Sequence, residues 1–149
     1  MKDIKLLKED IILEGIVESH IHYKVYLRAK IKDGILVFTP RGDIYLQVDT
    51  GFEGSIILPS DLLNRLDTVQ SGRSAKVKFV IGPAKEYFIF SGKIKINKLS
   101  VPEIEAEFIE IPGAEPLIGM EFLTLISSHL VFDFRKKVNK LFVVWDSQK

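Results

Sequence analysis

One stretch of the chain, residues 45–59, runs from an apolar strand-like segment straight into an acidic residue and then two glycines. It reads Tyr-Leu-Gln-Val-Asp-Thr-Gly-Phe-Glu-Gly-Ser-Ile-Ile-Leu-Pro. A carboxylate at the end of a buried strand costs free energy unless its oxygens find donors or share a proton. Gly51 has no Cβ, so its amide can approach the Asp49 carboxylate, and the Thr50 hydroxyl can donate or accept a further bond. The stretch predicts a turn that holds Asp49 rigidly, and we expect catalysis there.

A second motif lies near the other end of the chain, where Leu117, Ile118 and Gly119 precede a helix-like segment and a last strand at residues 129–134. A lone Asp-Thr-Gly is weak evidence, because a tripeptide of common residues often occurs by chance. The two motifs together, in this order and separation, resemble the signatures of the retropepsin-like aspartic proteases. The resemblance spans residues 44–134 and is closest to the small bacterial and archaeal members, which often carry Phe where this chain has Phe52.

This resemblance implies a mostly β, closed-barrel-like retropepsin (acid protease) fold with one or two short helices. It implies that Asp49 is the catalytic acid, that Thr50 braces two such loops against each other, and that Gly51 keeps their carboxylates coplanar. It also implies that Gly119 lets Leu117 and Ile118 pass close behind the aspartate turn, where a side chain would clash.

The resemblance further implies a flap, a hairpin that covers bound substrate and excludes water. Its tip would comprise Ile81, Gly82, Pro83 and Ala84, between strands at residues 75–81 and 87–89. Retroviral flaps have a glycine-rich tip, so Pro83 departs from that pattern and makes this tip stiffer. An ordinary hairpin without a lid function is the alternative.

The chain contains only one Asp-Thr-Gly, although this chemistry needs two carboxylates that share one proton. Two copies related by a twofold axis would bring Asp49 and its symmetry mate together. The resemblance therefore implies an aspartic-type peptidase that is active as a homodimer on a peptide or polypeptide. Water is the nucleophile, so no metal or organic cofactor is required.

Composition narrows the remaining classes of function. With 149 residues, 46% hydrophobic and 28% charged, the chain fits one globular domain, with residues 1–43 as an N-terminal strand extension. A net charge of +1 gives no reason to expect a nucleic acid or membrane partner, and the absence of cysteine excludes thiolate chemistry. We interpret His20, His22 and His129 as surface residues rather than metal ligands. Residues 1–10 resemble neither a signal peptide nor an anchor, so a cytoplasmic location is expected.

Periodicity and turn residues predict the remaining elements. Strands are expected at residues 11–17, 21–31, 35–38, 44–48, 55–58, 93–96 and 105–111, and turns at 33–34, 70–74 and 90–93. A helix of about two turns is expected after Pro59, with Ser60 as its N-cap, and a second helix at residues 120–126.

The apolar tail at residues 138–145 allows two interpretations. As a terminal edge strand it would favour aggregation, which a partner subunit would prevent. Alternatively, it packs back on its own chain.

Two other functions compete with the peptidase. A dimeric binding or assembly domain could keep the same fold without proteolysis, as Phe52 and the altered flap tip suggest. A phosphate cradle at the glycines after Asp49 is the weaker alternative, because the spacing matches neither phosphate-binding fingerprint and no Lys follows the loop.

Overall fold

The computed structural model describes the backbone of residues 11–19, 23–79, 82–96, 103–126, 129–133 and 140–144, and the side chains of residues 24–79, 82–96, 103–126 and 131. Strands dominate these residues, and two short helices accompany them. The elements are β1 (Ile11–Ser19), β2 (Tyr23–Lys32), β3 (Ile35–Phe38), β4 (Ile44–Val48), β5 (Ile56–Leu58), α1 (Ser60–Leu63), β6 (Val69–Val77), β7 (Lys85–Ile96), β8 (Ile104–Glu110), β9 (Leu117–Ile118), α2 (Met120–Ile126), β10 (His129–Asp133) and β11 (Lys140–Val144). The expectation of a mostly β chain with one or two short helices is confirmed.

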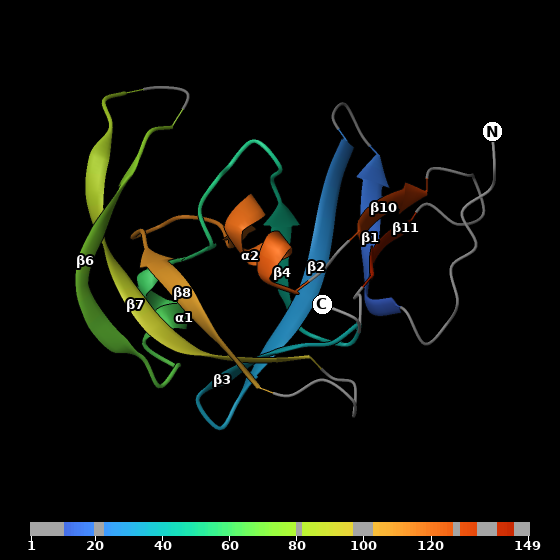
Figure 1. Cartoon of the computed structure of the whole chain (residues 1–149), viewed down its shortest axis with the longest axis horizontal. Coiled ribbons are helices and arrows are strands. Elements are labelled where there is room, and N and C mark those ends of the chain that lie inside the picture. The colour runs from blue at the N-terminus through green and yellow to red at the C-terminus, as the bar shows by residue number, and fades with distance from the viewer. Residues whose placement is uncertain are drawn as a thin grey trace.

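The strands form a ring in the order β2-β3-β7-β8-β5-β9-β4, because β4 pairs back with β2. Two groups of strands extend beyond the ring: β1, β11 and β10 continue from β2 on one side, and β6 pairs with β7 on the other (Figure 1). Part of the segment 1–43 thus lies in the ring itself, since β3 joins β2 to β7 through a parallel pairing. Neither helix in the described residues is long and apolar enough to cross a membrane.

The hairpin between β2 and β3 follows the sequence prediction. Its turn residues, Asp33 and Gly34, have φ angles of 52° and 77°. Positive φ at both central residues is the backbone of a type I′ turn, which matches the right-handed twist of paired strands. The Asp-Gly pair therefore fixes the register in which Lys32 faces Ile35.

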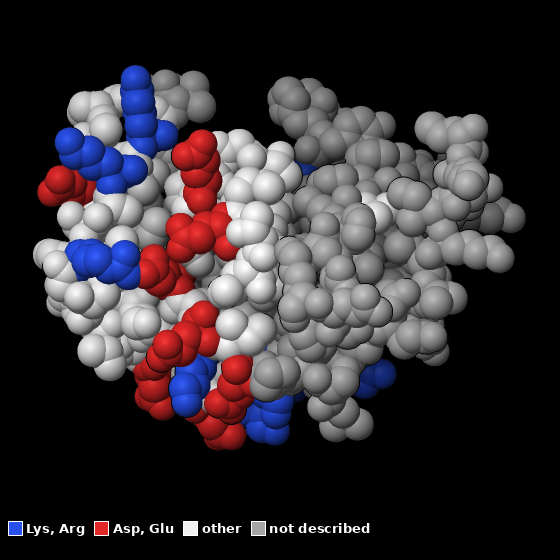
Figure 2. Space-filling view, in the orientation of Figure 1, with Lys and Arg blue, Asp and Glu red and all other residues white. Residues whose placement is uncertain are grey.

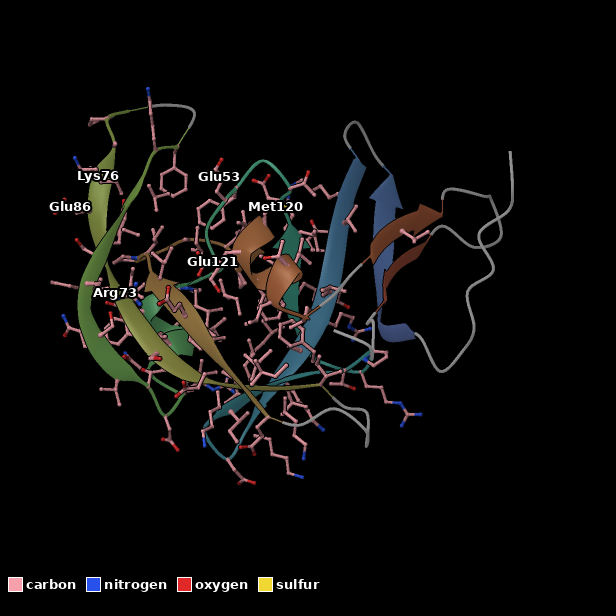
Figure 3. All side chains as sticks on the ribbon, viewed as in Figure 1. Glu53, Arg73, Lys76, Glu86, Met120 and Glu121 are labelled. Carbon is pink, nitrogen blue, oxygen red and sulfur yellow. The ribbon has the colours of Figure 1, made fainter. Side chains whose placement is uncertain are left out.

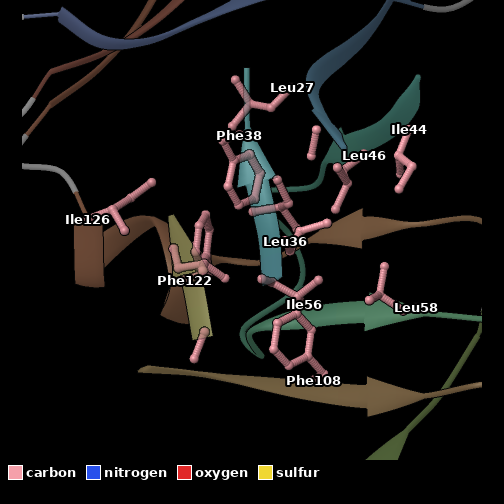
Figure 4. Packing of buried hydrophobic residues seen from close by; sticks show 14 of the residues in the cluster. Leu27, Leu36, Phe38, Ile44, Leu46, Ile56, Leu58, Phe108, Phe122 and Ile126 are labelled. Atoms are coloured by element: carbon pink, nitrogen blue, oxygen red, sulfur yellow. The ribbon is translucent and has the colours of Figure 1, made fainter. Parts of the chain in front are cut away.

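A hydrophobic core fills the ring, and α2 contributes to it. Phe38 from β3 and Phe122 from α2 are fully buried, and their rings stack with centroids 5.2 Å apart. Figure 4 shows both rings among aliphatic side chains from β2, β4 and β5. Burying one such side chain contributes about 1.5–3 kcal/mol, so α2 is anchored mainly by its apolar face.

The turn predicted at residues 70–74 is wrong, because β6 runs through these positions. Its register against β7 shifts between Gln70 and Ser74, so the extra residues form a bulge. The Ser71 hydroxyl donates to the Ile89 carbonyl at 2.9 Å, and Gly72 has a φ of 80°. Polar residues and glycine mark the bulge here rather than a reversal of the chain.

The turn predicted at residues 90–93 is also wrong, since β7 continues to Ile96. A Cβ at Gly92 would lie 2.9 Å from Thr68 Cγ2 and 3.1 Å from Phe108 Cε2. The glycine is therefore required by the close approach of neighbouring side chains and does not turn the chain.

The first helix is shorter than predicted. It has one turn, its N-cap position is Pro59 rather than Ser60, and no side chain caps it. After α1, the Asp67 amide donates to the Gly34 carbonyl at 2.9 Å, and this bond ties the segment to the β2–β3 turn.

The tail strand β11 has a neighbour on each side, pairing with β1 and with β10. It is not an edge strand, so the backbone follows the interpretation in which the tail packs on its own chain. The edge-strand reason for a partner subunit does not apply to it.

Candidate active site

Asp49 lies directly after β4, a central strand of the ring. Leu46 and Val48 of that strand point into the core, where Leu46 is 0% exposed. The Asp49 amide donates to the Ile118 carbonyl at 2.9 Å, which continues the pairing between β4 and β9 by one residue. Burial on one side and this bond on the other fix the backbone of Asp49, while its side chain remains half-exposed.

The turn after Asp49 holds its carboxylate. The Gly51 amide donates to Asp49 Oδ1 at 2.9 Å, which confirms the approach expected from the sequence. The Phe52 amide donates to the Asp49 carbonyl at 3.2 Å and closes the turn. Thr50 and Gly51 are both exposed, so the turn presents an oriented carboxylate at the surface.

The second motif passes behind this turn, as the resemblance implies. β9 runs parallel to β4, with Leu117 beside Gln47 and Ile118 beside Val48. A Cβ at Gly119 would lie 2.2 Å from the Gly54 carbonyl oxygen and 2.4 Å from Phe52 Cδ1. The expected clash of any side chain at residue 119 is confirmed.

The start of α2 is bonded to the loop that follows the aspartate turn. The Gly119 amide donates to Ser55 O and the Met120 amide to Phe52 O, both at 2.7 Å. The Glu121 amide lies 3.2 Å from Glu53 O and 3.1 Å from Gly54 O. Figure 3 shows Glu53 on the loop, with Met120 and Glu121 beneath it at the beginning of α2.

The sequence did not predict these backbone hydrogen bonds between the start of α2 and the loop. The first amides of a helix have no partner within the helix, so they need acceptors from elsewhere. Here the acceptors are the carbonyls of residues 52–55, and the donors come from residues 119–121. A helix that starts directly after Gly119 with no Ser, Thr, Asp or Asn before it is the only sequence signal of the arrangement.

The predicted flap region forms an antiparallel hairpin of β6 and β7. Gly82, Pro83 and Ala84 are exposed at its tip, and Gly82 has a φ of 103°. Ile81 lies outside the described residues. The hairpin is confirmed, and its action as a lid stays a prediction.

The stem of this hairpin packs beside the aspartate turn. Val77 and Tyr87 of the stem belong to a small apolar cluster, distinct from the main core, that also contains Phe52 and Leu117. Its fully buried centre includes Ile57 from β5, the strand that leaves the aspartate loop. The aspartate loop, the second motif and the hairpin stem thus all contribute side chains to one apolar cluster.

Among the described side chains, no three His, Asp or Glu converge as a set of metal ligands. Comparisons with protein-family models, with curated proteins and with solved structures gave no match. Function is therefore inferred from the site itself.

Proposed function

We propose that the protein is an aspartic-type peptidase with a retropepsin-like fold, active as a homodimer that contributes one Asp49 from each copy. The observation that carries this proposal is the aspartate turn: Gly51 donates to the Asp49 carboxylate, and Gly119 lies directly behind the loop with no room for a side chain. This combination gives a carboxylate that is oriented and half-exposed. Such preorganisation is what a general acid or base requires.

The chemistry divides between the two carboxylates. One Asp49, ionised, takes a proton from a water molecule as that water attacks the scissile carbonyl. The other, protonated, donates a hydrogen bond and then its proton to the carbonyl oxygen. Collapse of the tetrahedral intermediate breaks the C–N bond, and the amine leaves with a proton from the dyad. No other co-reactant is needed to balance the reaction.

The exposure of the turn supports the dimer. Thr50 and Gly51 are exposed at the point where a twofold-related copy would place its own turn. An isologous contact there would pair identical residues across the axis and bury both turns. We propose that the hairpin of β6 and β7 covers a polypeptide bound between it and the turn, in a cytoplasmic setting without a cofactor.

The direct test is Asp49→Asn, which keeps the shape of the side chain and removes its charge. We expect cleavage of an unfolded, carboxymethylated polypeptide to fall by at least about 10³-fold, since a general acid–base group contributes about 10²–10⁴-fold. Sedimentation equilibrium should show the same dimer for the variant. Asp43→Asn is the matched control, because Asp43 is exposed on the same segment before β4 and should be dispensable. Equal cleavage by wild type and Asp49→Asn would end the proposal.

A dimeric binding or assembly domain without proteolysis is the second candidate, and Phe52 favours it. Its ring lies against Gly119 and across Gly54, where added Cβ atoms would come within 2.4 Å of it, so it occupies space beside the turn. Pepstatin separates the two functions. A catalytic dyad should bind this statine inhibitor and raise the Tm by mass action, whereas an inert dimer should show no change in Tm.

A further inference from the structure

A second concave site lies between α2, β7 and β8, and Asp49 does not line it. It is an open depression of about 280 Å³. Its walls are contributed by seven residues: Ser55, Ser91, Glu105, Ala106, Glu107, Glu121 and Leu125. Glu121 and Leu125 are one helical turn apart, so they share the face of α2 opposite its buried residues.

The depression carries net negative charge. Figure 2 shows acidic side chains gathered over α2 and β8, with basic side chains of β6 beside them. Arg73 of β6 forms an ion pair with Glu107. Lys93 is paired with Glu105 across β7 and β8, but its ammonium lies 3.9 Å from the carboxylate of Glu103. Among the described residues, Glu105 and Glu121 therefore have no ion-pair partner.

Ser55 supplies a polar group at the floor of the depression. The residue is only 4% exposed, and its hydroxyl makes no hydrogen bond to the described part of the chain. No polar side-chain atom in the described residues is both sealed from solvent and unpartnered. The small accessible part of Ser55 therefore includes its hydroxyl, which opens into the depression it lines. A buried hydroxyl without a protein partner is unfavourable unless a ligand or water satisfies it.

One wall of the depression is apolar. Leu125 is 52% exposed although it is a large hydrophobic residue, and it lines the site. An aliphatic chain could cover Leu125 while its charged end reaches Ser55 and the carboxylates. Lysine side chains divide in this way into an apolar stem and a charged head.

We propose that this depression binds a primary alkylammonium group, as carried by a lysine side chain of a polypeptide or by a free polyamine. An ammonium has three donors, which suits the Ser55 hydroxyl and the Glu105 and Glu121 carboxylates. A four-carbon ammonium has five heavy atoms, about 150 Å³ at roughly 30 Å³ each, and fits the available volume. The site goes beyond the proposed peptidase activity and does not depend on it.

The test is a titration of the ¹⁵N-labelled full-length protein with n-butylammonium, followed by amide chemical shifts at constant ionic strength. Saturable shifts are expected at Ser55, Ala106 and Leu125. Butan-1-ol, an uncharged probe of the same length, should bind at least about tenfold more weakly, because it lacks the charge that the carboxylates attract. Equal binding of the alcohol, or no saturation by butylammonium up to about 10 mM, well above a weak millimolar Kd, would overturn the proposal.

Variants place the ammonium within the site. Glu121→Gln should weaken butylammonium binding about threefold to fivefold, as expected for one partly exposed charge pair. Glu121 is exposed, so the substitution should leave the fold intact. Ser55→Ala should weaken binding about tenfold, because it removes the hydroxyl that accepts a hydrogen bond from the ammonium. Glu86→Gln is the control, since Glu86 is an exposed carboxylate of β7 outside the depression. Equal binding by wild type, Ser55→Ala and Glu121→Gln would refute the assignment.

Two further probes distinguish the sources of the ammonium. A capped tripeptide with a central lysine represents a polypeptide, and spermidine represents a polyamine. Tighter binding of the peptide than of butylammonium at physiological salt indicates a polypeptide ligand. Tighter binding of spermidine that is lost as salt is raised indicates a polyamine, whose extra charges act through screened attraction.

Discussion

The aspartate turn at residues 49–51 and the second motif at residues 117–119 each end in a glycine, but the two glycines have different surroundings. A Cβ at Gly51 would meet only Asp49 Oδ1, at 3.3 Å. A Cβ at Gly119 would lie within 2.8 Å of three atoms, two of them carbonyl oxygens of the aspartate loop. The first glycine lies beside a half-exposed carboxylate, a side-chain group that can shift, and the second lies against backbone that cannot.

This difference separates two roles within one site. Gly119 determines whether the loop and α2 can approach closely enough for their backbone hydrogen bonds. Gly51 determines where one carboxylate oxygen lies. Substitution of Gly119 should therefore affect folding first, and substitution of Gly51 should affect chemistry first.

Gly119→Ala is expected to have the largest effect. The added methyl would force the loop at Gly54 and Phe52 away from α2, and overpacking of this kind costs about 1–3 kcal/mol or more. Loss of the bonds from Gly119 and Met120 to the loop would add to that cost. We expect a reduction of about 3 kcal/mol or more in the free energy of unfolding, measured by urea denaturation.

Gly113→Ala is the comparison for that experiment. A Cβ at Gly113 would meet nothing within 4 Å, and only its φ of 73° disfavours a side chain. Its cost should be limited to the backbone preference, about 1–2 kcal/mol. If Gly119→Ala cost no more than Gly113→Ala, the close approach behind the turn would not be a real constraint.

Gly92→Ala in β7 should have an intermediate effect. The nearest atoms belong to side chains, Thr68 Cγ2 at 2.9 Å and Phe108 Cε2 at 3.1 Å, and side chains can give way more easily than backbone. Alanine also regains about 0.5–1 kcal/mol that glycine loses in a strand interior. We expect a net loss of about 1 kcal/mol in urea denaturation.

A double variant sharpens the prediction for Gly92. Thr68→Ser removes Cγ2, the atom that would clash first. In a double-mutant cycle, Gly92→Ala with Thr68→Ser should therefore cost less than the sum of the single variants, by about 0.5–1 kcal/mol. If the losses in the free energy of unfolding were strictly additive, the contact with the Thr68 methyl would not be the cause of the destabilisation by Gly92→Ala.

These glycines also show why only part of the fold was predictable. The Asp33-Gly34 hairpin and the bounds of β3, β4 and α2 follow from turn chemistry and periodicity within a few neighbouring residues. Gly72 and Gly92 were assigned to turns, although one lies at a bulge and the other lies under Phe108. Their true roles depend on residues far away in the chain, as does the closure of the ring by β2 and β4.

Features of the candidate site also differ in whether neighbouring residues were sufficient to predict them. The contact between the Gly51 amide and the Asp49 carboxylate spans two residues, so the local sequence was sufficient to predict it. The resemblance supplied the position of Gly119 behind the turn. The bonds from Met120 and Glu121 to the loop join backbone groups whose side chains play no part. The lack of a capping residue before the helix indicates that its first amides need acceptors, but it does not say which carbonyls supply them.

Gly51→Ala should have the smallest effect on stability and the clearest effect on function. Its φ lies outside the left-handed region, so alanine is allowed there, and Asp49 Oδ1 need move by only a few tenths of an ångström. The reduced entropy of the unfolded chain offsets this strain by about 0.4–1 kcal/mol, so urea denaturation should change by less than about 0.5 kcal/mol. If Asp49 is half of a catalytic dyad, the same shift should lower kcat about tenfold, because misplacement by 1 Å costs about 10²-fold. A variant that loses stability but keeps its full rate of peptide cleavage would reverse the roles assigned to the two glycines.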